Sequence, residues 1–171
     1  GLELGQNVAE GDFREAVRRL GNTGVFTAVA YSYSYSGAGT RIEFQLSDVE
    51  KKKLVPAVFE NFVWFPDAEL LRELRERVPL FKQVLPAAGT LPDRVSDALQ
   101  AMLKEKQLPG HVDYLRQGKP DGGELTGIAY HVTDVEIHIR NCEFPGASPE
   151  LAATLAAVSR KLAGAPYERS S

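Results

Sequence analysis

The chain has 171 residues, of which 43% are hydrophobic and 25% are charged, the composition of an ordinary globular protein. Its 20 basic and 23 acidic residues interleave and give a net charge of −3, which argues against a phosphate backbone or an anionic bilayer as the main partner. No apolar run approaches the roughly 20 residues that cross a bilayer, and the single Cys142 excludes an internal disulfide.

The first predicted elements are a helix and a β-hairpin. Residues 12–15 have the sequence of a capping box, in which Asp12 accepts backbone amides and Glu15 reaches back, and an apolar stripe then continues to Leu20. The next residues, 25–36, alternate with a period of two, and a Gly-rich turn leads into a second alternating strand over 40–46. One face of the first strand carries three tyrosines, Tyr31, Tyr33 and Tyr35.

The middle of the chain predicts the order strand, helix, helix, strand, strand. Apolar periodicity and the flanking proline and glycine residues place these elements at 54–65, 67–78, 92–106, 111–117 and 124–132. The residues between the two helices, Val84 to Leu91, are predicted to form a loop. Because long exposed loops often carry contacts, this loop is a secondary candidate for binding.

The last part of the chain begins the same order again. Val135, Ile137 and Ile139 alternate and predict another strand. Ser148 then caps a helix with Pro149 at its first position, and one side of this helix is apolar up to Gly164.

An internal repeat accompanies these elements. Ser47-Asp48-Val49-Glu50 recurs 86 positions later as Thr133-Asp134-Val135-Glu136, and the alternating residues Ile42, Phe44 and Leu46 recur as Ile128, Tyr130 and Val132. The segment 60–66 likewise recurs at 140–145. A unit that recurs with partial copies at both ends indicates a segment of a longer tandem array. The predicted domains are a truncated unit at 1–50, a complete unit at 51–134 and a second truncated unit at 135–171.

The element order, together with the segment from Leu20 to Val29 that contains a Thr-Gly-x-Phe turn, resembles the POTRA (polypeptide-transport-associated) domain family. The alternating segment 135–141, which ends in a polar turn, is also similar to the opening strand of that family. The resemblance implies an α+β fold of tandem β-α-α-β-β units, each a three-stranded mixed sheet covered on one face by two helices. The usual glycine-asparagine turn is replaced here by Glu60-Asn61 and Arg140-Asn141.

The resemblance implies binding without chemistry. POTRA domains stand on the periplasmic side of outer-membrane β-barrel assembly and secretion proteins, and they receive unfolded polypeptides or accessory proteins. The implied means is β-augmentation, in which an edge strand pairs with an extended segment of another chain. We accordingly expect a periplasmic scaffold without cofactor. The full-length gene product is expected to carry a signal peptide upstream and a barrel of about 16 strands downstream.

In the family the first strand of each hairpin lies at the sheet edge, which implies edge strands at 25–35 and 111–117. The candidate polypeptide-binding residues are Val25, Thr27, Val29, Tyr31, Tyr33, Tyr35, Val112 and Tyr114. Two interpretations of the tyrosines stay open. They form an accessible ledge for an incoming strand, or they cover the helices of their own unit or a neighbouring unit.

The sequence offers little for catalysis or metal binding. His111, His131 and His138 have no carboxylate or cysteine at metal-ligand spacing, so we expect surface roles for them and no metal site. Lys51-Lys52-Lys53 is expected to be a solvated linker. The alternative functions are an α+β nucleic-acid-binding module that uses the open sheet face and a small hydrolase. Net charge disfavours the first, and the lack of a nucleophile–base pair disfavours the second.

Overall fold

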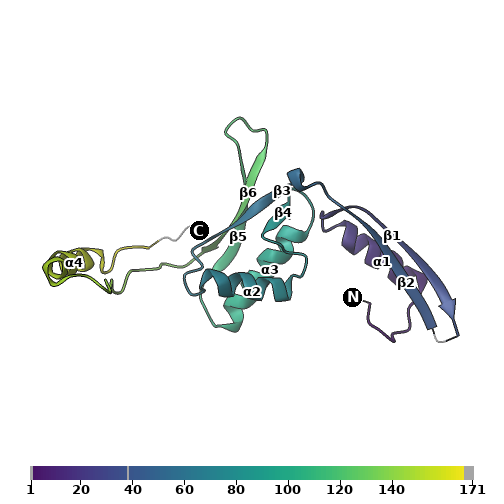
Figure 1. Cartoon of the computed structure of the whole chain (residues 1–171), viewed down its shortest axis with the longest axis horizontal. Coiled ribbons are helices and arrows are strands. Elements are labelled where there is room, and N and C mark those ends of the chain that lie inside the picture. The colour runs from purple at the N-terminus through teal and green to yellow at the C-terminus, as the bar shows by residue number, and fades with distance from the viewer. Residues whose placement is uncertain (1, 38, 168–171) are drawn as a thin grey trace.

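The computed structural model describes residues 2–37 and 39–167, and it has an α+β fold in which the elements follow one another along an extended molecule (Figure 1). The helices are α1 (Glu10–Gly21), α2 (Asp67–Arg77), α3 (Leu91–Glu105) and α4 (Pro149–Leu162), with a 3-10 turn at Lys51–Lys53. The strands are β1 (Phe26–Ser36), β2 (Gly39–Asp48), β3 (Leu54–Glu60), β4 (Val84–Pro86), β5 (His111–Gly118) and β6 (Leu125–Thr133).

Residues 54–133, here called the central unit, contain the main hydrophobic core. Their sheet has the order β4-β3-β6-β5, with β3 parallel to β6 and β5 antiparallel to β6. This is the predicted element order with one addition. The predicted three-stranded sheet has a fourth strand, because Val84–Pro86, expected to lie in a loop, pairs antiparallel with Leu54–Pro56.

The core of the central unit forms where one face of the sheet meets α2 and α3. Tyr130 is fully buried on β6, stacks on Phe59 of β3 with ring centroids 5.7 Å apart, and donates its hydroxyl to the carbonyl of Pro92 at 3.0 Å. Burial raises the pKa of this hydroxyl well above its usual range. The other buried apolar side chains come from every helix and strand of the unit and from the loops between them. They include Phe65, Leu74, Leu85, Leu99 and Ile128.

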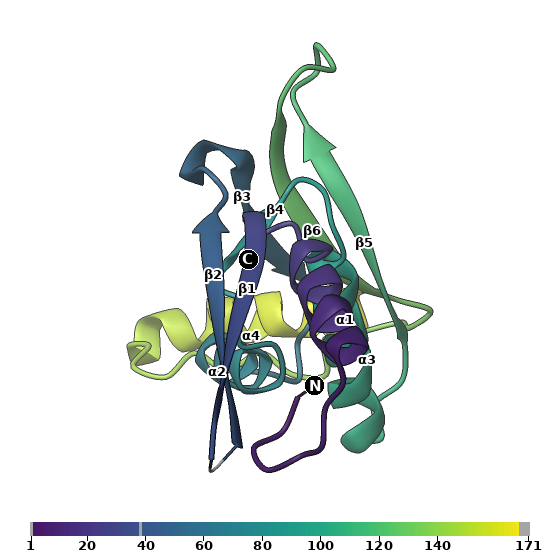
Figure 2. The same ribbon diagram turned by 90° about the vertical axis from the view of Figure 1, so that its right-hand side faces the viewer.

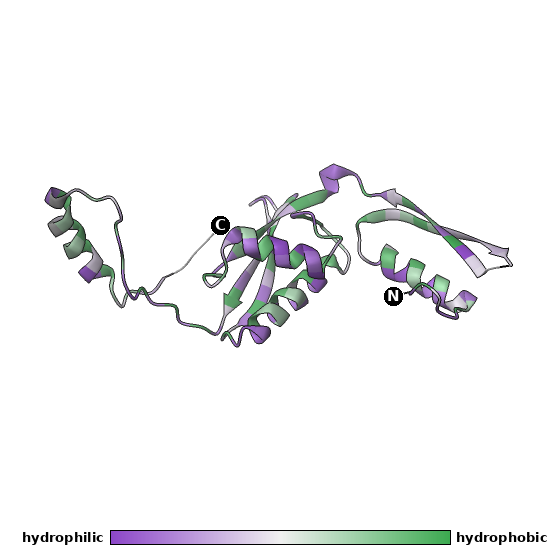
Figure 3. Ribbon diagram, turned by 60° about the horizontal axis from the view of Figure 1, so that its bottom comes forward, coloured by the Kyte–Doolittle hydropathy of each residue, from purple (hydrophilic) through white to green (hydrophobic). Residues whose placement is uncertain are grey.

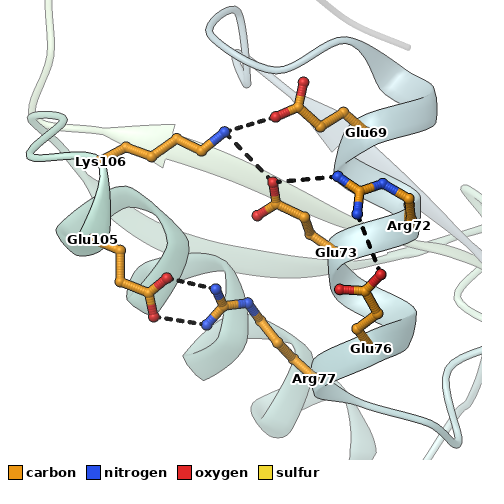
Figure 4. Close-up of polar contacts among 7 residues, drawn as sticks. All are labelled: Glu69, Arg72, Glu73, Glu76, Arg77, Glu105 and Lys106. Carbon is orange, nitrogen blue, oxygen red and sulfur yellow. Dashed lines mark hydrogen bonds and ion pairs between the residues drawn. The ribbon is translucent and has the colours of Figure 1, made fainter.

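Ion pairs join α2 to the C-terminal end of α3 on the wet side of this core (Figure 4). Arg77 donates to both carboxylate oxygens of Glu105, at 2.8 and 2.5 Å. Lys106 donates to Glu69 at 2.8 Å and its Nζ lies 4.5 Å from the centre of the Phe65 ring. These exposed contacts hold the two helices side by side, but each contributes modestly to stability.

At the N-terminal end, α1 packs on a two-stranded sheet made by β1 and β2 (Figure 2). Phe13 is the buried centre of this contact, with its ring centroid 5.8 Å from that of Tyr31 and 6.0 Å from that of Tyr33. The predicted capping box over Asp12 to Glu15 is wrong, because the helix begins two residues before Asp12. The helix begins at Glu10, and Asp12 occupies its third position, where its carboxylate accepts the amide of Ala9 at 2.8 Å.

Glu15 therefore does not reach back to the helix start but lies between two arginines. It accepts hydrogen bonds from Arg18 and from Arg19 at 2.7 Å, and these lower the pKa of its carboxyl from the ordinary 4.5 to about 2. Because the folded pKa is the lower one, the stabilisation exists above pH 4.5 and disappears as the pH falls towards 2. We expect a small loss of α1 helicity in this window by circular dichroism. Glu15→Gln should remove that pH dependence.

At the C-terminal end, the predicted strand over Val135 to Ile139 is wrong as a full strand. The only bridge recorded for this segment joins His138 to Pro166, within the described residues. Three main-chain hydrogen bonds tie it to the residues that follow α4: Ile139 N–H to Ala165 O at 3.0 Å, Gly164 N–H to Ile139 O at 2.8 Å and Tyr167 N–H to Ile137 O at 2.8 Å. The segment is thus extended but has too short a partner to build a ladder.

Candidate functional site: two sheet edges

The clearer candidate surface is the outer edge of β5. This strand lies at one end of the four-stranded sheet, with β6 as its neighbour on the other side. Along an antiparallel strand the main-chain N–H and C=O groups point alternately towards and away from the neighbour. The hydrogen-bond partners of the Val112 main chain show which residues of β5 direct their main-chain groups away from β6.

Side chains of α3 already occupy the main chain at the beginning of this edge. The Val112 N–H donates to Oε1 of Gln100 at 2.9 Å, and the Val112 carbonyl accepts from Oγ of Ser96 at 3.4 Å. The Val112 side chain is itself buried in the core. The main chain of Val112, a predicted binding residue, is therefore closed to an incoming strand. The sequence predicted the helix over 92–106 but not that its side chains bond this strand.

By alternation, Tyr114 and Arg116 point their main-chain groups in the same outward direction as Val112, beyond the reach of Gln100. Tyr114 donates its hydroxyl to Oδ1 of Asp93 at 2.6 Å, and the Arg116 guanidinium lies 5.5 Å from the centre of the Tyr114 ring. Burial, followed by the contact with Asp93, raises the pKa of the Tyr114 hydroxyl. The open part of the β5 edge thus runs from Tyr114 to Gly118.

The second candidate surface is β1. Its sheet contains only β1 and β2 among the described residues, so the side of β1 away from β2 carries no third strand there. A bulge interrupts the pairing between Phe26 and Ala28. Thr27 lies in this bulge and turns its hydroxyl back to β2, donating to Ser47 O at 3.2 Å.

The other five predicted residues of this strand divide into three groups. Val25 precedes β1, and its carbonyl accepts the Val49 amide at 2.9 Å, so it belongs to the base of the hairpin. Val29 and Tyr31 are half-buried, and the Tyr31 ring lies against Phe13 of α1. Tyr33 touches Phe13 but is 45% exposed, and Tyr35 is 79% exposed. The inner tyrosines cover their own helix, as one interpretation held, and the outer end of the ladder remains open to solvent.

The turn between α1 and β1 contacts the central unit, which the sequence did not predict. The Thr90 N–H donates to the Asn22 carbonyl at 2.8 Å, and the Leu91 N–H donates to the Thr23 carbonyl at 3.4 Å. Gly24 (φ +83°) and Gly89 (φ +106°) allow the two turns to touch. A Cβ on Gly89 would lie 2.6 Å from the Thr23 oxygen. The first of these segments was predicted to be a turn and the second a loop, and the available signal was that each contains a glycine next to a threonine.

Beside this contact lies a cavity of about 650 Å³ at the base of the hairpin. Its apolar lining comes from Val25, Phe26, Leu54, Leu80 and Val84, and its charged rim from residues that include Asp48, Lys51 and Lys82. The two signs of charge at this rim do not favour one sign of ligand, so we assign no site to it.

Over residues 2–37 and 39–167, no three histidine, cysteine or acidic side chains come together in a way that could hold a metal ion. The helices in that part of the chain are all too short or too polar to cross a bilayer.

No protein-family model matches the chain, and no curated protein matches it either.

Proposed function

We propose that this chain is a non-catalytic polypeptide-binding scaffold, made of POTRA-like units divided at 1–50, 51–134 and 135–171. It binds extended segments of other proteins by β-augmentation on the periplasmic side of an outer-membrane assembly or secretion apparatus. The single observation that carries the binding mode is the edge of β5. Beyond Val112, whose main chain is bonded to α3, the strand directs further main-chain groups outward from Tyr114 to Gly118. The outer side of β1 is a second surface of the same kind.

Similar packing in the first hairpin supports the division into units. Tyr31 of β1 lies opposite Phe44 of β2, and Tyr114 of β5 lies opposite Tyr130 of β6. Both pairs of rings touch, with centroids 6.5 and 5.4 Å apart. Phe44 and Tyr130 are also the residues that the sequence repeat aligns, 86 positions apart.

A peptide-binding assay tests the function. The probe is a fluorescent ten-residue peptide of alternating threonine and valine, flanked by lysines, and its control is the same peptide N-methylated at every residue, which removes the donors of both strand edges. Main-chain pairing requires that the first binds and the second does not. Binding of both peptides equally, or of neither at millimolar concentration, would contradict the proposal. Salt-dependent binding of a single-stranded RNA oligonucleotide would instead favour the nucleic-acid alternative.

A matched pair of variants locates the site. Arg116→Pro removes an outward N–H while leaving the ladder to β6 intact, as an edge strand tolerates, and it should weaken peptide binding about fivefold, the value of one hydrogen bond. Arg116→Ala removes the side chain and keeps the N–H, so it should bind as the unchanged protein does. Equal loss in both variants would assign the effect to the guanidinium, and no loss in either would exclude this edge.

A further inference from the structure

The outer side of β2 is an open copy of a surface that is filled in the central unit. Ile42, Phe44 and Leu46 of β2 align with Ile128, Tyr130 and Val132 of β6. The three β6 residues are buried, whereas Ile42 and Phe44 are only half-buried. The contrast is largest at the last position, where Leu46 is 47% exposed and Val132 is 4% exposed.

The central unit shows what fills this surface. β3 pairs in parallel with β6, with Ala57 beside Ile128 and Glu60 beside His131. Leu70 and Leu74 of α2, the helix that follows β3, are buried in the same core. A strand followed by a helix therefore completes the sheet and the core together.

The C-terminal segment carries a second strand–helix of this kind that packs on no sheet of its own chain within the described residues. The repeat aligns Phe65-Pro66 with Phe144-Pro145, and Leu151 and Leu155 of α4 keep the spacing of Leu70 and Leu74. Phe65 is 1% exposed and Phe144 39%; Leu70 is 2% exposed and Leu151 56%. In Figure 3, α4 shows hydrophobic residues along its length without a helix or sheet against it.

The main chain of the C-terminal segment has one side occupied and one side available. The main-chain groups of Ile137 and Ile139 point to the occupied side, where they bond to the main chain of residues 164–167. In β3 the main-chain groups of Ala57 point towards β4, and its N–H donates to Gln83 O at 3.0 Å. By alternation, the main-chain groups of Val58 and Glu60 point towards β6. An offset of 80 positions makes Ile137 equivalent to Ala57. His138 and Arg140 are then placed to pair as Val58 and Glu60 do.

The available side of β2 follows from the same alternation. Val49 donates its N–H to Val25 O at 2.9 Å and so faces the first strand of the hairpin. Every second residue before it, Ser47, Gln45 and Glu43, faces the same way. Ile42, Phe44 and Leu46 therefore present their main-chain groups away from β1, as their equivalents in β6 do towards β3.

We propose that two copies of this chain associate head to tail, the extended segment 137–140 and α4 of one copy completing the β1–β2 sheet of the next. Residues 137–140 add in parallel beside residues 42–45, with His138 next to Glu43, and α4 packs beside α1. Figure 1 shows α4 and the β1–β2 hairpin at opposite ends of the molecule, with the central unit between them, so a contact between these two elements joins two copies. Such a heterologous contact builds chains or rings. The inference rests on the division into units proposed above, and it is independent of peptide capture.

Disulfide trapping tests the register. In a Cys142→Ser background, one preparation carries Glu43→Cys and another carries His138→Cys. Neighbouring residues on paired strands lie within disulfide reach, so the mixture should form a cross-linked heterodimer on mild oxidation. Ser34→Cys, on β1 and one strand further away, is the matched control that should not cross-link to His138→Cys.

Association itself is measured by sedimentation over a concentration range. The unchanged chain should increase in mass with concentration, and Leu151→Glu, a change at an exposed position of α4, should remain monomeric. A monomer at about millimolar concentration, or association without the 43–138 cross-link, would overturn the proposal. So would an internal 43–138 disulfide in a monomer that carries both cysteines, because it would show closure within one chain. None of these outcomes bears on whether β5 binds a peptide.

Discussion

Leu74→Ala is expected to lower the free energy of unfolding of the central unit by about 2–5 kcal/mol, the range for truncating a buried leucine. Leu74 is fully buried beneath the sheet with Phe59, Leu99 and Tyr130 in the same cluster. Trp64, the only tryptophan of the chain, packs against this core, so its fluorescence during urea unfolding reports on the central unit alone. A loss of this size is a large part of the stability of a small domain.

The matched control is Leu155→Ala in α4. Leu155 follows Leu151 by four positions as Leu74 follows Leu70, but it is only half-buried and belongs to a different hydrophobic contact. We expect no change in the Trp64 transition at low protein concentration, where head-to-tail association is absent. If the two variants shifted the transition equally, the central unit would not be the separate core described above.

Gly24→Ala is expected to break the contact between the α1–β1 turn and the central unit. Gly24 has φ +83°, which costs an alanine roughly 1–2 kcal/mol, and a Cβ at this position would collide with the Ala88 carbonyl. The Thr90 amide, which donates to Asn22 O at 2.8 Å, should then lose hydrogen-exchange protection at least about tenfold. Hydrogen exchange followed by mass spectrometry or NMR measures this.

Gly122→Ala is the control, at a glycine of positive φ in the turn between β5 and β6 that takes no part in this contact. Gly122 has φ +75° but no atom within 4 Å of a Cβ, so its substitution adds backbone strain without a collision. The Thr90 amide should keep its protection in this variant. Equal losses in both variants would mean that the turn contact contributes nothing beyond conformational strain.

The order of elements in the central unit could be predicted because each long element has its own apolar period. Leu70 and Leu74 repeat at helical spacing, and Ile128, Tyr130 and Val132 at strand spacing. β4 could not be predicted in this way. It is three residues long, includes Pro86, and exists because β3 offers an edge to it. That partner is 30 positions away for Val55 and Leu85, a distance at which local pattern carries no information.

The strand predicted over 135–139 was wrong for the opposite reason, because the local pattern was present and, among the described residues, the partner strand was not. Its alternation is that of a strand, but a ladder also requires a partner of similar length, and Ala165–Tyr167 is short. At the candidate site the strand β5 could be predicted from the sequence, but the closure of its edge at Val112 could not. Whether Val112 is open depends on Gln100 and Ser96, which come from α3 and reach over the edge.

The acceptors for two amides at the beginning of α3 come from residues that precede the central unit. Thr90 and Leu91 donate to the carbonyls of Asn22 and Thr23, so the turn before β1 caps a helix of the following unit. Melting of the α1–β1 region would leave these donors to water and fray α3 from its first turn. The α1–β1 region and the central unit are therefore thermodynamically coupled, and the stability of each includes a contribution from their contact. A pulling force applied along the chain would reach α3 through this cap before it reached the buried aromatic cluster.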